Sequence, residues 1–361
     1  MVASSPRERT ATRSDHRVGH ATAARGPHPD GARSPSHATI GLHHVTAIAG
    51  EPQRNVDFYV GLLGLRLVKR TVNFDDPGTW HLYYGDTDGR PGSLLTFFPW
   101  PRARRGRPGL GQVAVTQLAI PTAALGFWLA RLATAGIRYD GPVTRLDGER
   151  VIAFPDPDGM LLELVATDAA ASLPGWGGIV PDAMSIRGLH AATLWVADAA
   201  PTVQLLVDRL GHREVARYDT TIRLASGDGA PVTLVDVRAI PGFLPGMGGA
   251  GTVHHVAFRT GTDEAAFALR DAVVDAGLGI TEQRDRHYFR SFYFREPGHV
   301  LFELATDAPG FTVDEPLATL GEALKLPAQY EPMRAQLEAS LPAFHLPTAT
   351  PPSAGDAPSG A

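Results

Sequence analysis

Four stretches of alternating apolar and polar residues recur along the chain, and each is followed by an amphipathic stretch. Alternation is typical of a strand with one buried face, and apolar residues three and four positions apart indicate a helix. The strand-like stretches begin at Leu42, Val115, Leu189 and Val253. The helical stretches lie at roughly 53–63, 122–135, 200–210 and 263–276. Short strands broken by Gly, Pro and Asp follow each helix, so the pattern predicts four βαβββ modules.

The closing strands of the modules repeat as well. Residues 157–164 read PDGMLLEL and residues 297–304 read PGHVLFEL, which places Glu163 and Glu303 at equivalent positions. The corresponding positions in the first and third modules hold Phe97 and either Asp236 or Val235. We therefore expect an α+β fold in which four βαβββ modules pair into two curved half-barrel sheets, with alternate residues of each strand lining a cavity.

The repeat divides the chain into five segments. Modules one and two occupy residues 39–175, and modules three and four occupy residues 185–310. Residues 311–346 form a C-terminal extension. Residues 1–38 hold almost no large apolar side chain, and residues 347–361 are rich in Pro, Ala and Ser. Such segments cannot bury enough apolar surface to offset chain entropy, so we expect both tails to be disordered.

Each module offers one inward position on its first strand and one on its last. In chain order, the residues at these positions are His44 and Phe97, Gln117 and Glu163, Ala191 and Asp236 or Val235, and His255 and Glu303. Pairing module one with module four brings His44, His255 and Glu303 into one cavity. Two imidazoles and one carboxylate form a facial triad, which leaves open coordination positions and suits a ferrous iron that binds an organic substrate and dioxygen.

Pairing the modules in chain order is the alternative. His44 would then share a cavity with Gln117 and Glu163, while His255 and Glu303 would lie in the other cavity. We favour the pairing of module one with module four because it collects all the good ligands in one site. A single inward His is more often a hydrogen-bonded core residue than a ligand. Three candidates at equivalent repeat positions favour a metal site, whereas we expect Glu163 to be structural.

Four further residues are candidates for the same site. His43 and His254 precede the proposed ligands by one residue, so a regular strand would point them away from the metal, and only a bulge or twist would bring them near. Tyr293 lies ten residues before Glu303, which hints at the same strand face. A Tyr hydroxyl and the Arg286 guanidinium would orient a phenolate oxygen and stabilise developing negative charge. The alternative is that they are simply a buried tyrosine and a surface arginine.

Composition and charge exclude several classes of function. The 33 Lys and Arg residues against 38 Asp and Glu residues give a formal net charge of −5, so no basic field is available for nucleic acid or an anionic membrane. The absence of Cys excludes disulfides, thiolate nucleophiles and iron–sulfur clusters. No apolar run is long enough to span a membrane, and no signal-peptide core is present, so we expect a cytoplasmic protein.

The motifs together resemble a known family. The four-module repeat with its Leu-His-His-Val and Phe-Glu-Leu strands is similar to the vicinal oxygen chelate superfamily, which includes glyoxalases and extradiol dioxygenases. A narrower resemblance, to dioxygenases that cleave the rings of hydroquinones, rests on residues 57–59, 67–75, 80–86, 91–92, 286–291 and 310–315. It implies Fe(II) held by His44, His255 and Glu303. It also implies that the substrate side is lined by His43, His254, Arg286 and Tyr293.

The resulting hypothesis is an Fe(II)-dependent, extradiol-type dioxygenase that opens a hydroquinone-type or catechol-type ring with O2. Mn(II) could substitute for the iron. His254 or His43 would move protons, while Tyr293 and Arg286 would orient the ring oxygen. The partners would be a small aromatic substrate, O2 and, in a homo-oligomer, further copies of the chain, with no nucleic acid or membrane. The alternatives are a glyoxalase-like metal-dependent lyase or isomerase, and a non-enzymatic protein that binds an aromatic ligand.

Overall fold

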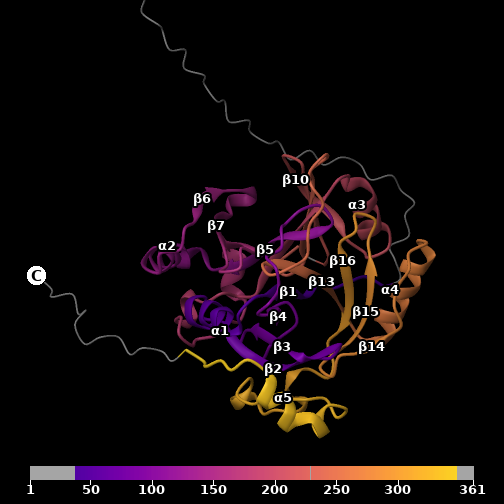
Figure 1. Ribbon diagram of the computed structural model, residues 1–361. Helices are drawn as coiled ribbons and strands as arrows, with labels where there is room; N and C mark the ends of the chain where they lie inside the picture. Colours follow the sequence, from indigo (N-terminus) through magenta and orange to yellow (C-terminus); the bar gives the residue numbers. More distant parts are fainter. Residues whose placement is uncertain (1–36, 228, 348–361) are drawn as a thin grey trace, which may run out of the picture. The chain divides into compact units, whose positions relative to one another are not determined.

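Two curved sheets of eight strands each form the core of the computed structural model, which describes residues 37–227 and 229–347 (Figure 1). This arrangement confirms the predicted α+β fold of paired half-barrel sheets. Apart from residues 37–38 and 347, the two tails predicted to be disordered lie outside the described residues.

Modules one and four share the first sheet. Its strands follow the order β14 (Arg284–Asp285), β15 (Arg290–Arg295), β16 (Leu301–Thr306), β13 (Thr252–Gly261), β1 (Leu42–Ala49), β4 (Leu94–Pro99), β3 (Asp76–Gly85) and β2 (Arg66–Asn73). The two modules meet where β1 pairs antiparallel with β13. The favoured pairing of module one with module four is therefore confirmed.

Modules two and three share the second sheet. Its strands follow the order β10 (Arg213–Tyr218), β11 (Thr221–Ala225), β12 (Leu234–Ala239), β9 (Leu189–Val196), β5 (Gln112–Ile120), β8 (Leu161–Ala166), β7 (Arg150–Pro155) and β6 (Asp140–Thr144). Each of the predicted ranges 39–175 and 185–310 thus contributes one module to each sheet.

The helices are α1 (Pro52–Val56, continued by a π-helical turn at Asp57–Leu62), α2 (Leu125–Thr134), α3 (Ala199–Asp208), α4 (Asp263–Asp275) and α5 (Arg334–Ser340). Helices α1 to α4 lie close to the ranges that the apolar pattern predicts, whereas α5, in the C-terminal extension, is not predicted. Helix α4 begins after Thr262, whose hydroxyl accepts a hydrogen bond from the Ala265 N–H. Gly277, with a φ of +78°, follows its C-terminal end, a position where glycine is favoured.

The linker between modules one and two pairs with the linker between modules three and four. The backbones of Arg107 and Met247 exchange two hydrogen bonds of 2.9 Å, and the Leu110 N–H donates to the Leu244 carbonyl. A Cβ on Gly109 would lie 2.5 Å from the Leu244 carbonyl oxygen, so the close approach of the backbones requires glycine there. The glycine-rich segment 241–251 is therefore held to the other linker by isolated β-bridges.

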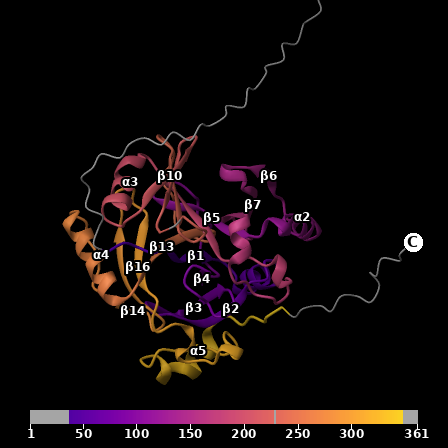
Figure 2. The ribbon, with the colours of Figure 1, turned by 180° about the vertical axis from the view of Figure 1, so that it is seen from behind.

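The C-terminal extension packs against the first sheet, and both views place α5 beside β2 and β3 (Figure 2). Its main anchor is Lys69 on β2, a fully buried lysine whose Nζ donates to Asp314 at 2.7 Å and to Glu315 at 2.8 Å. The Trp80 indole N–H also donates to the Pro342 carbonyl at 2.8 Å. Among the residues that the structure describes, no helix is long and apolar enough to cross a membrane.

Candidate metal centre

His44, His255 and Glu303 converge inside the first sheet. The two imidazole Nε2 atoms lie 3.2 Å apart, and Oε2 of Glu303 lies 3.2 Å from His44 Nε2 and 2.8 Å from His255 Nε2. All three side chains are buried. Within residues 37–227 and 229–347 they form the one group of three His, Cys, Asp or Glu side chains whose ligand atoms lie close enough to hold a metal ion.

Adjacent strands position the three side chains. His44 lies on β1 and His255 on β13, and these two strands pair with each other. Glu303 lies on β16, where it pairs with Ala257, two residues beyond His255. Side chains two residues apart on a strand point to the same face, so the carboxylate comes to the same side of the sheet as the imidazoles.

The donor set fits a divalent metal ion. Oε2 of Glu303 is buried and has no properly directed hydrogen bond, although two ring nitrogens lie close to it, as expected when all three atoms aim at a common point. Ser291 donates its hydroxyl to the other carboxylate oxygen. Burial alone would raise the pKa of Glu303, but the two imidazoles outweigh this and hold the pKa well below its usual value. The carboxylate is therefore ready to bind a cation.

The residues before the two histidine ligands form β-bulges. Leu42 pairs with Phe258 and His44 with Ala257, so His43 is an extra residue on β1. Thr46 pairs with His255 and Ala47 with Val253, so His254 is an extra residue on β13. At a bulge, a side chain no longer points to the face that strand alternation predicts. These irregularities explain why His43 and His254 lie beside the candidate ligands.

Each bulged histidine contacts the ring of its neighbour. Nδ1 of His43 lies 2.9 Å from Nδ1 of His44, and Nδ1 of His254 lies 2.8 Å from Nδ1 of His255. A ligand imidazole that binds metal through Nε2 carries its proton on Nδ1 and needs an acceptor there. Burial and the neighbouring His44 lower the pKa of His43 to about 3, which keeps that ring neutral and able to accept. The chain thus supplies both acceptors.

The position of His43 does not fit the predicted role in proton transfer at the substrate. His43 is buried behind His44 and is not among the residues that line the cavity in front of the candidate metal centre. A hydrogen bond to the backbone of Thr306 also engages it. His254, in contrast, is exposed and lines the cavity.

The strand register corrects the predicted inward residue of module one. Phe97 packs against Tyr59 in the hydrophobic core, with ring centroids 4.5 Å apart, on the opposite face of β4 from the site. Thr96 pairs with Thr46, two residues beyond His44, as Glu303 pairs with Ala257, two residues beyond His255. The module-one counterpart of Glu303 is therefore Thr96.

Module two requires a similar correction. Glu163 pairs with Gln117, so the counterpart of His255 is Val115, two residues before Gln117, and not Gln117 itself. The predicted ambiguity in module three is resolved in favour of Asp236, which pairs with Thr193, two residues beyond Ala191. The prediction of Gln117 is wrong because a shift of two residues along a strand leaves the inward face unchanged, so alternation alone cannot detect it.

Ion pairs occupy the corresponding region of the second sheet. Arg223 donates to both oxygens of Asp236, at 2.7 and 2.9 Å, and to Glu149 at 2.8 Å. Arg145 donates to Glu163 and to Gln117, at 2.8 and 2.9 Å. The guanidinium groups thus neutralise carboxylates that a metal ion would otherwise bind, in agreement with the structural role expected of Glu163.

A cavity of about 270 Å³ is lined by two of the three candidate ligands, His44 and His255. Its lining is rich in aromatic side chains, namely Phe74, Tyr83, Phe98, Trp100, Phe289 and Tyr293. Arg286 also lines it, and its Nε donates to the Tyr293 hydroxyl at 3.1 Å. Burial and the Glu303 carboxylate raise the pKa of Tyr293 well above its usual value, although Arg286 opposes this, so Tyr293 keeps its proton. The structure thus brings both predicted residues to the cavity.

His81 on β3 is a cavity residue that the sequence analysis missed. Its Nε2 lies 3.0 Å from the Thr96 hydroxyl, and its Nδ1 lies 2.8 Å from the Tyr83 hydroxyl. Burial and the nearby His44 lower the pKa of His81 well below its usual value, so the ring is neutral. Tyr83 pairs with Thr96 as Tyr293 pairs with Glu303, and this symmetry between modules could have identified the β3 strand as a wall of the site.

A family model and individual relatives agree with this geometry. The model of the Glyoxalase/Bleomycin resistance protein/Dioxygenase superfamily matches residues 41–164 and 188–304. The chain belongs to this superfamily, as the resemblance of its motifs predicts. It is 45% identical over 311 residues to the Putative ring-cleaving dioxygenase MhqO of Bacillus subtilis (strain 168), with 85% of this chain and 97% of that protein covered.

Two further comparisons support the same relationship. The chain is 33% identical over 306 residues to the chlorohydroquinone/hydroquinone 1,2-dioxygenase of Sphingobium indicum, with 82% of this chain and 94% of that protein covered. A crystal structure of a putative dioxygenase from Bacillus subtilis has a TM-score of 0.83 and 44% sequence identity, and the match covers 87% of this chain and 100% of that chain. The protein is thus related along most of its length to proteins named as ring-cleaving dioxygenases.

Proposed function

We propose that this protein is an Fe(II)-dependent dioxygenase that cleaves a hydroquinone-type ring in the extradiol manner. The observation that carries the proposal is the convergence of His44, His255 and Glu303, two of which, His44 and His255, line an aromatic-rich cavity. The relatives named as ring-cleaving dioxygenases support the reaction class, and the hydroquinone dioxygenase supports the substrate class.

The donor set supports Fe(II), with Mn(II) as a substitute. Fe(II) held by His44, His255 and Glu303 would bind and activate a substrate oxygen and dioxygen. His43 and His254 accept the Nδ1 protons of the two ligand rings and so orient their Nε2 atoms. The buried Glu303 contributes the negative charge that balances the cation.

The cavity supports an aromatic substrate of one ring. A free volume of about 270 Å³ accommodates a single ring with small substituents, and Phe98 and Phe289 offer apolar surfaces for its faces. Arg286 and Tyr293 are bound to each other at the wall of the cavity, next to His255. Arg286 would stabilise negative charge on a ring oxygen, and the protonated Tyr293 would donate a hydrogen bond to it.

His254 and His81 are the candidates for proton transfer. Both line the cavity, whereas His43 does not. His254 is exposed, so protons can exchange with solvent at its free ring nitrogen. His81 is neutral and is hydrogen-bonded to Tyr83, which lies in the same cavity wall. Because Nδ1 of His254 accepts the proton of His255, the free ring nitrogen of His254 carries a proton and would act as a donor. A phenolic proton would instead reach His81 through Tyr83.

The decisive experiment is oxygen uptake by protein that is purified without oxygen and reconstituted with Fe(II). Hydroquinones and catechols are offered in turn, with methylglyoxal plus a thiol as a parallel assay. Stoichiometric uptake with a ring-opened product is the expected result for hydroquinones. Turnover of the thiol adduct without oxygen consumption would instead indicate a lyase or isomerase, and failure to retain any metal would indicate a binding protein.

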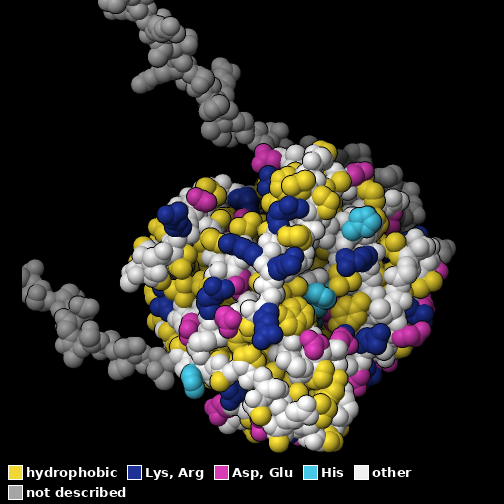
Figure 3. All heavy atoms as spheres, in the orientation of Figure 1, with side chains coloured by type: hydrophobic (Ala, Val, Ile, Leu, Met, Phe, Trp, Pro, Cys, Tyr) yellow, Lys and Arg dark blue, Asp and Glu magenta, His cyan; other side chains and the backbone are white. Residues whose placement is uncertain are grey.

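Other properties of the protein stay predictions. Figure 3 shows Lys and Arg side chains across the middle of one face, with acidic and hydrophobic side chains among them. A mixed surface of this kind, together with the net charge of −5, supports the expectation of no nucleic-acid partner. We also propose that the protein is cytoplasmic, that it forms a homo-oligomer, and that its domains span residues 39–175 and 185–310.

A further inference from the structure

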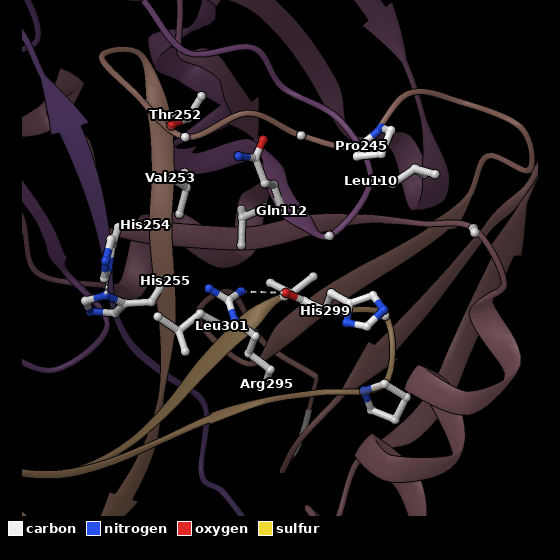
Figure 4. A pocket seen from close by; sticks show the side chains of 18 of the residues that line it. Leu110, Gln112, Pro245, Thr252, Val253, His254, His255, Arg295, His299 and Leu301 are labelled. Atoms are coloured by element: carbon white, nitrogen blue, oxygen red, sulfur yellow. Dashed lines mark hydrogen bonds between the residues drawn. The ribbon is translucent and has the colours of Figure 1, made fainter. Parts of the chain in front are cut away.

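A second and larger cavity adjoins the candidate metal centre. Its volume is about 640 Å³, and it lies between the start of β13, the start of β5 and the turn that joins β15 to β16 (Figure 4). His254, His255 and Leu301 line both this cavity and the aromatic cavity. These three side chains lie between the two spaces, and we call the larger space the side cavity.

Polar groups in the side cavity have unused hydrogen-bonding capacity. Figure 4 shows Arg295, His299 and Gln112 around the same space. Arg295 donates one hydrogen bond of 2.8 Å to the His299 carbonyl, and among the described residues it forms no ion pair with a carboxylate. The side-chain oxygen of Gln112 is buried and has no partner in the part of the chain that the structure describes. A guanidinium with free donors is suited to a carboxylate.

The backbone at His299 is a second sign of a site. His299 has a φ of +73°, in the left-handed region that glycine adopts at no steric cost. The equivalent turn of module two has Gly159 there, with a φ of +95°. Module four thus keeps an imidazole at a position where its sister module uses glycine, and that imidazole lines the side cavity. A positive φ is uncommon for a residue other than glycine, and strained positions of this kind cluster at functional sites.

One acidic side chain lines the side cavity as well. Asp198 is the N-cap residue of α3, and its carboxylate accepts a hydrogen bond from the Ala200 N–H. The Asp198 carboxylate is therefore engaged by the N-terminus of α3 rather than by Arg295. The remaining lining consists mainly of Gly, Pro and aliphatic residues, so Arg295 is the positive charge that a ligand entering this space would meet.

We propose that the side cavity binds a carboxylate carried on a flexible arm of the aromatic substrate, with Arg295 and His299 as its donors. This inference rests on the proposed function and narrows the substrate class to hydroquinones with an acidic side chain. The ring occupies the aromatic cavity, and the arm extends from it into the side cavity. The arm passes Leu301, a half-buried side chain that can change rotamer. Gln112 accepts a hydrogen bond from a water molecule or hydroxyl that accompanies the acid.

The test compares hydroquinones that carry an ethanoate, propanoate or butanoate arm with their methyl esters. One arm length is expected to give a kcat/KM at least tenfold higher for the acid than for its ester. In Arg295→Gln and in His299→Gly, this acid-to-ester ratio is expected to fall at least tenfold. His299→Gly relieves the positive φ, so it cannot act by straining the turn. The matched control is Arg138→Gln, at an exposed arginine near the end of α2, and it leaves the ratio unchanged.

A binding measurement separates this inference from the proposed function. Calorimetry without oxygen measures binding of the same acids and esters with no turnover, and Arg295→Gln is expected to raise the Kd of the acid at least tenfold. Failure to cleave hydroquinone itself would overturn the proposed function, while the binding result would still decide the acid site. Equal binding of acid and ester would overturn the inference, as would binding of free propanoate as tight as that of the ring-linked acid.

Discussion

His43 is the bulged residue of β1, and its Nδ1 lies 2.9 Å from Nδ1 of His44. The bulge turns a side chain that alternation would direct to the other face into a partner of the candidate ligand. Its neutral ring accepts the proton that His44 must carry on Nδ1 when Nε2 binds metal. His254 and His255 repeat this relationship on β13. The site therefore contains two histidine pairs related by the repeat.

Replacement of His43 by Phe is expected to weaken metal binding without removing a ligand. Loss of such a hydrogen-bond partner costs about 10–100-fold in metal affinity. Competition with a chelator, followed by elemental analysis, measures the change. His345→Phe, at an exposed histidine of the C-terminal extension, is the control. Equal metal retention by wild type and His43→Phe would show that His43 does not support the ligand.

Glu303→Gln is expected to abolish tight metal binding. The amide has nearly the same shape but lacks the charge that balances a divalent cation between the two imidazoles. Glu163→Gln changes the equivalent carboxylate of the second sheet, where Arg145 is the partner, and is expected to leave metal content unchanged. Metal per chain after dialysis checks both variants. Loss of metal in Glu163→Gln as well would contradict the assignment of the site to the first sheet.

Addition of metal to metal-free protein is expected to raise the temperature of unfolding. An ion that binds only the folded chain stabilises it by about 4 kcal/mol when its concentration is about 1,000 times the dissociation constant. Calorimetric scans with and without Fe(II) or Mn(II) measure the shift. The shift should disappear in Glu303→Gln, and an equal shift there would point to binding elsewhere.

Lys69→Met is expected to destabilise the fold by about 3–5 kcal/mol, because it leaves the carboxylates of Asp314 and Glu315 without their buried cation. Urea unfolding measures the change, with Lys325→Met at a half-exposed lysine as the control. Asp314 also accepts a hydrogen bond from Tyr288, next to the cavity residue Phe289. We therefore expect a higher KM as well, and an unchanged KM would limit Lys69 to a role in stability.

Acid is expected to destabilise the protein partly through Glu149. Burial would raise the pKa of Glu149, but the hydrogen bond to His190 and the charge of Arg223 lower it from 4.5 to about 2. A carboxyl with a lowered pKa contributes stability above pH 4.5 and loses it as the pH falls toward 2. The contribution is on the order of 3 kcal/mol at neutral pH. The free energy of unfolding should decline less steeply between pH 6 and pH 3 in Glu149→Gln than in wild type. Parallel curves would show that Glu149 does not contribute to the loss of stability in acid.

Several features of the site could be predicted from the sequence because they depend on strand alternation within a repeat. His44, His255 and Glu303 stand out by their equivalent places in the modules, and the structure brings them together. Other features depend on register. Phe97 and Thr96 are adjacent, so only the pairing of β4 with β1 shows that Thr96 is the counterpart of Glu303. The sequence could not show that Val115, rather than Gln117, is the counterpart of His255, because residues two positions apart on a strand share the inward face.

The sequence by itself determined the modules, the helices and the residue types able to hold a metal, because hydrophobic periodicity and local caps act over a few residues. The tertiary structure decided which modules share a sheet, where the bulges at His43 and His254 fall, and how Arg223 and Arg145 fill the second sheet with ion pairs. It also placed His81 in the wall of the aromatic cavity and Arg295 in the wall of the side cavity. These outcomes depend on contacts between segments far apart in the chain. A local sequence pattern does not indicate the energies of such contacts.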